Sequence, residues 1–455
     1  MIAENSAAQD TLRISLDEFI NRGIQNSGQM AFEQGAVDLA RNRTDQARAQ
    51  RILPRFDLSS QHGVVPGVKS DSTLPSGNPL PQGQFYLDPN LRNDWDDWAI
   101  FTRAEVTMLQ PIYTWGAISN AIDAAKAGAS AAQFEFEAKQ AGAEVQLFEL
   151  YYSYLLSLEV SRLLDDANRQ IDQVGERLQE LIDEGDPDIK EADLFKFDIF
   201  KEEFQVQRAE VEQGRQFVER IWRRALQAAP GEYFMPREQF LDPIPIQIEE
   251  FEIYENYALN GRPELRGVES GIQAMQKSVQ ASRAQYLPSL FLGLNARFAH
   301  TPNRPRQDNP FIINSTNFST LAVGLTIRQN LNFFTQRQSV ERVQIEYRRT
   351  EDLRHAISDG VLIELSDAYR EAVIADSKVL QTERALNVTK EWVRHEQLNY
   401  DFGFGDVNDL TDAIQKELEL ELELKQNIFE RNKRLAELYK AAGIPVTQLY
   451  RPGNR

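Results

Sequence analysis

Four short stretches of the chain alternate between apolar and polar side chains with a period of two residues. In the stretch from Trp98 to Leu109, Ile100 and Val106 fall on one parity, and Arg103 and Glu105 fall on the other. Because successive side chains of a β-strand point to opposite faces, each stretch predicts a strand with one apolar and one polar face. Such alternation over about 9–11 residues is typical of strands that cross an outer membrane. The predicted strands are residues 54–64, 98–110, 288–298 and 318–328.

Long segments with helical periodicity separate these strands. We expect Pro111 to end the second strand, because proline has no N–H to donate, and a helix to begin near Ile112. No proline occurs from there to residue 184, which predicts one helix of about 70 residues, roughly 105 Å long. Helices of this length are typical of a coiled coil or a helical duct rather than a globular core. The other predicted helices cover residues 16–52, where Ser15 and Glu18 have the spacing of a capping box, and residues 191–228, 333–401 and 406–442.

The order of elements occurs twice along the chain, as helix, strand, loop, strand, long helix, turn and helix. We therefore predict a first structural repeat over residues 1–230, an equatorial connector over 231–260 and a second repeat over 261–455 with a C-terminal equatorial tail. The predicted fold class is mainly α with a membrane β-barrel portion. Four strands cannot close a barrel, and open sheet edges are not tolerated in lipid. Three chains would provide twelve strands, which is an allowed barrel size.

Composition and charge exclude several classes of function. The net charge of −19 leaves no basic stripe for nucleic acid, and the lack of cysteine removes disulfides, thiol catalysis and zinc–thiolate sites. The chain contains no run of about 20 apolar residues, so the sequence predicts no transmembrane helix. The first residues lack the regions of a signal peptide, so we expect a mature form with a replacement initiator Met1. The four histidines lack metal-ligand spacing and no catalytic motif occurs, so we expect no metal, no cofactor and no enzyme.

Several motifs occur in a characteristic order along the chain, namely the two Leu-Pro strand starts, the passage from Leu109 to Gly116, the Tyr151-Tyr152 and Ala368-Tyr369 segments, and the two helix–helix turns. Through these motifs and their order, the chain resembles the TolC family of outer-membrane efflux proteins. The resemblance implies a homotrimer with a twelve-stranded barrel in the outer membrane and an α-helical tunnel that extends into the periplasm. It also implies two partners, a periplasmic adaptor protein and an inner-membrane transporter of the RND or ABC type.

The resemblance further implies that the helix–helix turns form the periplasmic tip, where the aperture closes and the adaptor docks. Asp409 and Asp412 match the family's two acidic rings, where three copies of each would form a cation-favouring pore constriction. The alternative is a solvated first helical turn, where aspartates are favourable anyway. Tyr400 matches a latch tyrosine, but Gly405 stands at the position of the latch arginine, so packing is the alternative for Tyr400. The remaining tip and gate residues that we predict are Gly185, Glu191, Asp193 and Gly403.

Three arginines and one glutamate share the polar parity of the strands. Arg103, Arg297 and Arg328 either line an anion-tolerant barrel lumen or pair with Glu105 and equivalent residues, and pairing is the expectation that we favour. The predicted function is passive exit of drugs, small toxic solutes or proteins through an outer-membrane channel of a tripartite efflux or type I secretion system. The alternative is a soluble structural coiled-coil scaffold, which the acidic helices favour and the alternating strands oppose.

Overall fold

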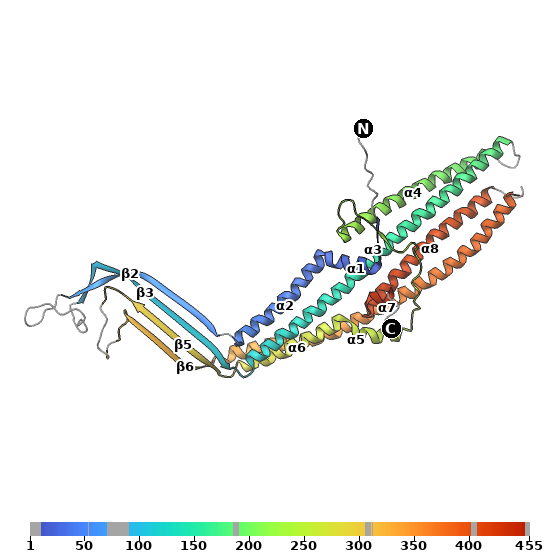
Figure 1. Cartoon of the computed structure of the whole chain (residues 1–455). Helices are drawn as coiled ribbons and strands as arrows, with labels where there is room; N and C mark the ends of the chain where they lie inside the picture. The colour runs from blue at the N-terminus through green and yellow to red at the C-terminus, as the bar shows by residue number, and fades with distance from the viewer. Residues whose placement is uncertain are drawn as a thin grey trace, which may run out of the picture. The chain divides into compact units, whose positions relative to one another are not determined.

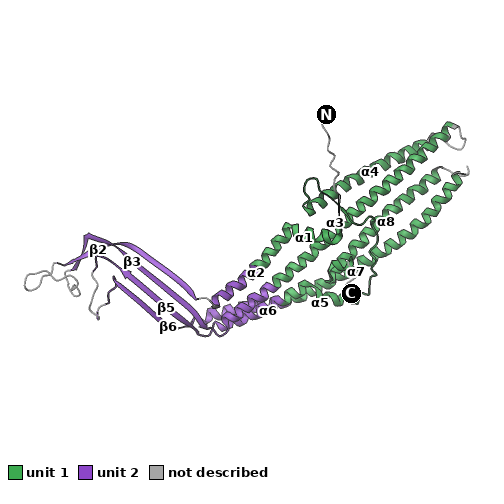
Figure 2. Ribbon diagram, viewed as in Figure 1, with its two compact units in different colours: residues 1–38, 131–269, 352–455 green, residues 39–130, 270–351 purple. Residues whose placement is uncertain are grey.

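The computed structural model describes residues 11–52, 54–70, 91–184, 191–304, 311, 313–401 and 407–450. The chain forms two compact units (Figure 2). Unit 1 comprises residues 1–38, 131–269 and 352–455, and unit 2 comprises residues 39–130 and 270–351. Each unit combines segments from both sequence repeats. The repeat boundaries at 230 and 261 therefore describe chain order, and they remain a prediction.

Two helices, rather than the single predicted one, cover the first segment. They are α1 (Leu16–Asn26) and α2 (Gly28–Ile52). The predicted capping box is present, since the Ser15 hydroxyl accepts from the Glu18 N–H and the Glu18 carboxylate accepts from the Ser15 N–H. The break lies at Ser27, whose backbone is extended and whose hydroxyl accepts from the Met30 N–H at 3.3 Å. A serine that caps the following helix is the physical reason for the break.

The second strand continues through Pro111, so the predicted end of that strand and the helix start near Ile112 were wrong. Strand β3 covers Leu91–Tyr113, and its register against β5 shifts between Pro111 and Tyr113. A bulge of this kind accommodates a residue that cannot donate a ladder hydrogen bond. Trp115 and Gly116 then adopt positive φ values of 52° and 85°, and α3 (Ala117–Glu184) begins directly after them.

The remaining bounds lie close to the predicted ones. Strand β2 covers Arg55–Ser70, and β2 and β3 extend further toward their connecting loop than expected. The other elements are α4 (Glu191–Leu226), α6 (Pro263–Ala284), β5 (Ser289–His300), β6 (Phe318–Arg328), α7 (Phe333–Asp401), α8 (Val407–Ala441) and the 3-10 helix η1 (Val446–Leu449).

The predicted connector contains regular structure that the sequence did not indicate. Strand β4 (Tyr233–Pro236) pairs in parallel with β1 (Thr11–Ile14), and α5 covers Phe251–Gly261. Short strands without alternation carry no periodic signal, which explains why they were missed. Both strands belong to unit 1.

Unit 2 is built on one four-stranded antiparallel sheet in the order β2-β3-β5-β6 (Figure 1). Two hairpins, β2–β3 and β5–β6, come from the two sequence repeats. The β3–β5 pairing joins them, from Thr102 opposite His300 to Tyr113 opposite Leu290. One sheet therefore contains all four predicted strands.

The core of unit 1 lies where α1, α3, α4 and α8 meet. Phe19 stacks on Trp222 with a centroid distance of 4.0 Å, and both side chains are fully buried together with Tyr151. A second apolar cluster between α3, α4 and α8 includes Leu178 and Phe204. Burial of such aromatic side chains stabilises the packing of these long, weakly amphipathic helices.

No described helix combines the length and the apolar character that a membrane span requires.

Candidate channel-forming surfaces

The register of the sheet assigns every side chain to one of two faces. Arg103 lies opposite Gln61 and Ala299, and Glu105 lies opposite Ser59 and Arg297. Directly opposed residues of an antiparallel sheet point to the same side. All four predicted lumen residues, Arg103, Glu105, Arg297 and Arg328, therefore share one polar face of the sheet.

The other face of the sheet is apolar, and its side chains are exposed in the single chain. Leu58 and Ile327 each retain 73% of their accessible surface, on the two outer strands. An apolar surface of this size on an isolated chain indicates contact with lipid or with another protein. The exposed apolar residues on this face include Phe56, Leu58, Val64, Trp98, Ile100, Phe298, Leu321, Val323, Leu325 and Ile327.

The favoured pairing of the arginines with Glu105 is not formed within the described residues. The Glu105 carboxylate instead accepts a hydrogen bond from the Asn295 side chain at 2.6 Å. Arg103 lies over the Phe101 ring at 5.7 Å, and Arg328 lies over the Phe291 ring at 5.6 Å. The register places Arg297 opposite Glu105, but the two side chains form no ion pair among the described residues. A shared register position therefore does not by itself produce an ion pair.

Of the predicted tip residues, those with a described backbone lie at the ends of the long helices of unit 1. Gly185, Gly403 and Gly405 fall outside the described residues, as do the side chains of Glu191 and Asp193, whose backbone forms the first turn of α4. At this end, the Lys196 ammonium on α4 donates to the Asn408 side chain on α8 at 3.2 Å. The starts of the two return helices are thus in direct contact.

Asp409 and Asp412 occupy the first turns of α8, and both side chains are exposed. Their neighbours Leu410 and Ala413 are buried, with 2% and 0% exposure. The apolar side of α8 therefore faces the interior of unit 1, and both carboxylates point away from it. Asp409 and Asp412 are three residues apart, so they lie on the same side of the helix. The role of the two aspartates as pore rings remains a prediction.

Tyr400, near the end of α7, packs against the second apolar cluster of unit 1. Its side chain is half-buried against this cluster, whose buried members come from α3, α4 and α8. This packing matches the alternative that we gave for Tyr400, while a latch across helices remains untested.

Side chains of α8 that hold the connector were missed by sequence analysis. Asn432 is fully buried; its carbonyl oxygen accepts from the Ile244 N–H at 3.0 Å and its amide donates to the Asp242 carbonyl at 2.9 Å. Arg431 donates to the carbonyls of Ile244 and Ile246 at 2.9 and 3.0 Å and forms an ion pair with Asp376. Their only sequence signal is polar residues on an otherwise apolar helical stripe, which is too weak to interpret alone.

A cluster around Arg262 closes the C-terminal end of α8. Arg262 is 5% exposed, donates to the carbonyls of Lys440 and Ala441, and pairs with Glu364 at 2.6 Å. Lys440 approaches Glu364 at 3.0 Å. Burial raises the pKa of Glu364, but hydrogen bonds and charges from Arg262 and Lys440 outweigh it and hold the pKa below its usual value.

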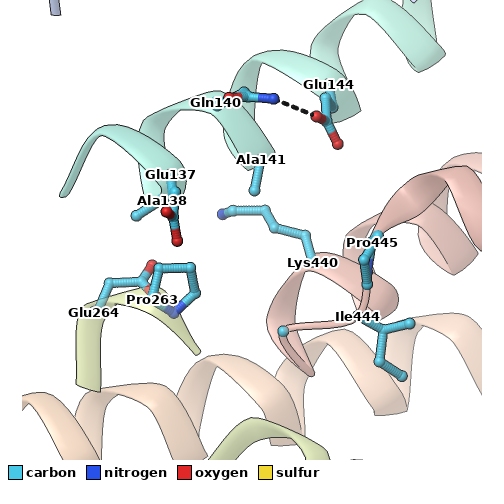
Figure 3. A pocket seen from close by; sticks show the side chains of 11 residues that line it. Glu137, Ala138, Gln140, Ala141, Glu144, Pro263, Glu264, Lys440, Ile444 and Pro445 are labelled. Carbon is cyan, nitrogen blue, oxygen red and sulfur yellow. Dashed lines mark hydrogen bonds between the residues drawn. The ribbon is translucent and has the colours of Figure 1, made fainter. Parts of the chain in front are cut away.

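Figure 3 shows the cleft that adjoins this cluster, of about 190 Å³, between α3, the start of α6 and the turn after α8. Gln140 donates to Glu144 across its wall at 3.0 Å. Burial raises the pKa of Glu144, and the hydrogen bond from Gln140 opposes this shift in part. In the described part of the chain, no group of three or more His, Cys, Asp and Glu side chains is placed to hold a metal ion.

Comparison with known proteins agrees with this geometry. Residues 256–444 match a family model described as outer membrane efflux protein. A sequence comparison with curated proteins found no match.

Three solved structures share the fold over nearly the whole chain. The outer-membrane channel MtrE of Neisseria gonorrhoeae has a TM-score of 0.72 at 13% identity, and the match covers 95% of this chain and 89% of MtrE. VceC from Vibrio cholerae has a TM-score of 0.68 at 15% identity, covering 95% of this chain and 96% of VceC. The channel protein CusC has a TM-score of 0.72 at 14% identity, covering 95% of this chain and 94% of CusC.

The family match covers the second repeat, and the shared fold extends across both repeats. Several of the solved structures with this fold are described as outer-membrane channels. Residues 256–444 therefore match the outer membrane efflux protein family, in agreement with the TolC-type resemblance, and the chain as a whole has the fold of solved outer-membrane channels.

Proposed function

We propose that three copies of this chain form a channel in the outer membrane with a helical tunnel in the periplasm, through which solutes leave the cell passively. The observation that supports this proposal most directly is the sheet of unit 2. Its outer strands, β2 and β6, each pair on one side only within the described chain, and one sheet face is apolar and exposed. In lipid, unpaired strand edges are not tolerated, so the edges must meet those of other copies.

Three copies satisfy this requirement with twelve strands. In a closed ring, β6 of one copy lies beside β2 of the next and the apolar faces turn to lipid. The polar face then lines the lumen. The antiparallel alternation of strand directions continues across such a junction, since β2 and β6 run in opposite directions within the sheet.

The partners that complete such a machine are a periplasmic adaptor and an inner-membrane transporter of the RND or ABC type. The match of residues 256–444 to the outer membrane efflux protein family supports this assignment in general form, because a passive exit channel needs a separate energy source for efflux. The exported solute class is drugs and small toxic solutes, with secreted proteins as the type I secretion alternative.

Disulfide cross-linking tests the junction between copies, because the chain contains no cysteine. A panel combines Ser59→Cys on β2 with a single cysteine on β6, at Thr320, Ala322 or Thr326, all on the polar face. We expect at least one combination to give covalent trimers on oxidation of membranes. Single-cysteine variants are the control. Monomers only, from every combination in outer-membrane fractions, would contradict the proposed closure.

Single-channel recording tests the function itself. Purified protein in a planar bilayer is expected to give discrete conductance steps. A well-folded sample that never inserts, and that fractionates with soluble proteins, would support the coiled-coil scaffold instead.

A further inference from the structure

The polar face of the sheet carries positive charge that no carboxylate neutralises among the described residues. Arg103, Arg297 and Arg328 are exposed, and none of them makes an ion pair within that part of the chain. Arg55 on the same face is different, because Asp57 lies 3.1 Å from its Nε. The whole chain has a net charge of −19, so this excess of positive charge is a local feature of the polar face.

The single acid among the predicted lumen residues does not cancel this excess. Glu105 is half-buried and bonds to the neutral Asn295 amide, so it neutralises none of the three guanidinium groups directly. Each chain therefore presents three positive charges against one negative charge in this set.

Two of the arginines lie on aromatic rings. Arg103 lies over Phe101, and Arg328 lies over Phe291. Gly63 makes the first contact possible, because a Cβ at that position would come within 2.6 Å of the Phe101 ring. A guanidinium has five N–H donors, so a cation–π contact with one ring leaves donors available for a second partner.

This combination is suited to an anion with an apolar body. A planar guanidinium recognises carboxylate, sulfonate or phosphate with two parallel hydrogen bonds, and an adjacent aromatic ring covers apolar surface. We propose that the polar face of the sheet is a recognition surface for organic anions, with Arg103–Phe101 and Arg328–Phe291 as its two binding pairs and Arg297 as an added charge. This inference rests on the proposed function, since it requires that this face line the channel.

Reversal potentials in a KCl gradient, with the protein in a planar bilayer, test the charge. The variant Arg103→Gln plus Arg297→Gln plus Arg328→Gln is expected to lower the anion-to-cation permeability ratio by about twofold or more at low salt. At about 1 M salt, where screening acts within about 3 Å, the difference between variant and parent should disappear. The control is Arg103→Lys plus Arg297→Lys plus Arg328→Lys, which keeps the charge and should keep the ratio.

Benzenesulfonate is the probe for the recognition step. Added to one side, it should reduce the single-channel current of the parent more than chloride at equal concentration, and the glutamine variant should lose this block. The lysine variant should lose most of it too, because an ammonium does not form the planar bidentate contact.

Each outcome decides one question. Steps of normal conductance whose permeability ratio and benzenesulfonate block are the same in parent and glutamine variant would overturn the inference and leave the channel intact. Absence of steps from the folded parent would instead overturn the proposed function. Trimer content on unheated gels confirms that the variants assemble.

Discussion

At the scale of single residues, a glycine and a buried arginine end α8 together. Gly443 has a φ of +71°, its N–H donates to the Lys440 carbonyl at 2.9 Å, and the Ile444 N–H donates to the Tyr439 carbonyl at 2.8 Å. This is the Schellman arrangement, which favours glycine because other residues are strained at positive φ. The Arg262 backbone nitrogen would lie 2.9 Å from a Cβ at Gly443.

We expect Gly443→Ala to destabilise unit 1 by about 1–3 kcal/mol, from backbone strain together with the close approach of Arg262. Thermal unfolding followed by circular dichroism measures the effect. Gly214→Ala in α4 is the matched control, because a Cβ added at Gly214 would have no described atom within 4 Å and alanine favours a helix interior. An equal or higher melting temperature for Gly443→Ala would contradict the strain argument.

The pKa of Glu364 makes stability depend on pH at this same cluster. A carboxyl whose pKa is lower in the folded state contributes stability that is present above the unfolded pKa and is lost as the pH falls through the folded pKa. Glu364→Gln should therefore cost about 1–3 kcal/mol near pH 7, since it leaves Arg262 with one fewer charged partner, and the difference should shrink below about pH 4.

Urea denaturation of parent and Glu364→Gln across that pH range measures this dependence. Glu346→Gln, whose partner Arg342 is 69% exposed, is the control and should change stability by less than about 1 kcal/mol. A pH-independent difference for Glu364→Gln would show that the lost hydrogen-bond geometry, rather than the charge, matters.

At the scale of elements, the structure shows how a connector without a hydrophobic pattern is held in place. Residues 242–246 have no helix or strand of their own, and their backbone groups bond to α8 through Arg431 and Asn432. Buried backbone groups need partners, so a side-chain amide supplies what secondary structure does not.

Asn432→Ala is expected to leave a buried N–H and a buried carbonyl without partners and to cost about 2–4 kcal/mol. The connector should then exchange its amide hydrogens faster, measured by hydrogen exchange and mass spectrometry. Asn256→Ala is the control, because the Asn256 side-chain amide donates to the Glu252 carbonyl one turn earlier on an exposed helix face. Unchanged exchange in residues 242–246 would disprove this role of Asn432.

Much of the element pattern could be predicted from sequence because it depends on local rules. The capping box of Ser15 and Glu18, the parity of the four strands and the bounds of β6 and α7 needed no information from distant residues. Pro111 was misinterpreted because its tolerance inside β3 depends on a bulge against β5, which lies far away in the sequence. The arginines of the sheet face were misinterpreted for a related reason, since parity gives a face but not a partner.

At the scale of the whole molecule, the acidic residues at the start of α8 carry a prediction about selectivity. If three copies bring Asp409 and Asp412 into two rings, Asp409→Asn plus Asp412→Asn should lower the cation-to-anion permeability ratio by several-fold and weaken block by added Mg²⁺. Planar-bilayer recordings in a KCl gradient measure both effects.

The control is Asp165→Asn plus Asp166→Asn on α3, which removes the same charge from a pair of side chains that already have arginine partners. Loss of selectivity in the control alone, or in neither variant, would move the constriction away from Asp409 and Asp412. The alternative of a solvated helix start would then be preferred.

The sequence by itself determined the period of each segment and therefore its type, its two faces and the duplicated order of elements, because these follow from contacts between residues a few positions apart. It also leads to the prediction that four strands need further copies, since the number of strands follows from the sequence pattern alone. Only the tertiary structure decided that β3 pairs with β5, that Asn432 and Arg431 hold the connector, and that Arg103 and Arg328 lie over aromatic rings while Glu105 bonds to Asn295. These contacts join residues far apart in sequence, whose geometry is set by packing and not by local propensity.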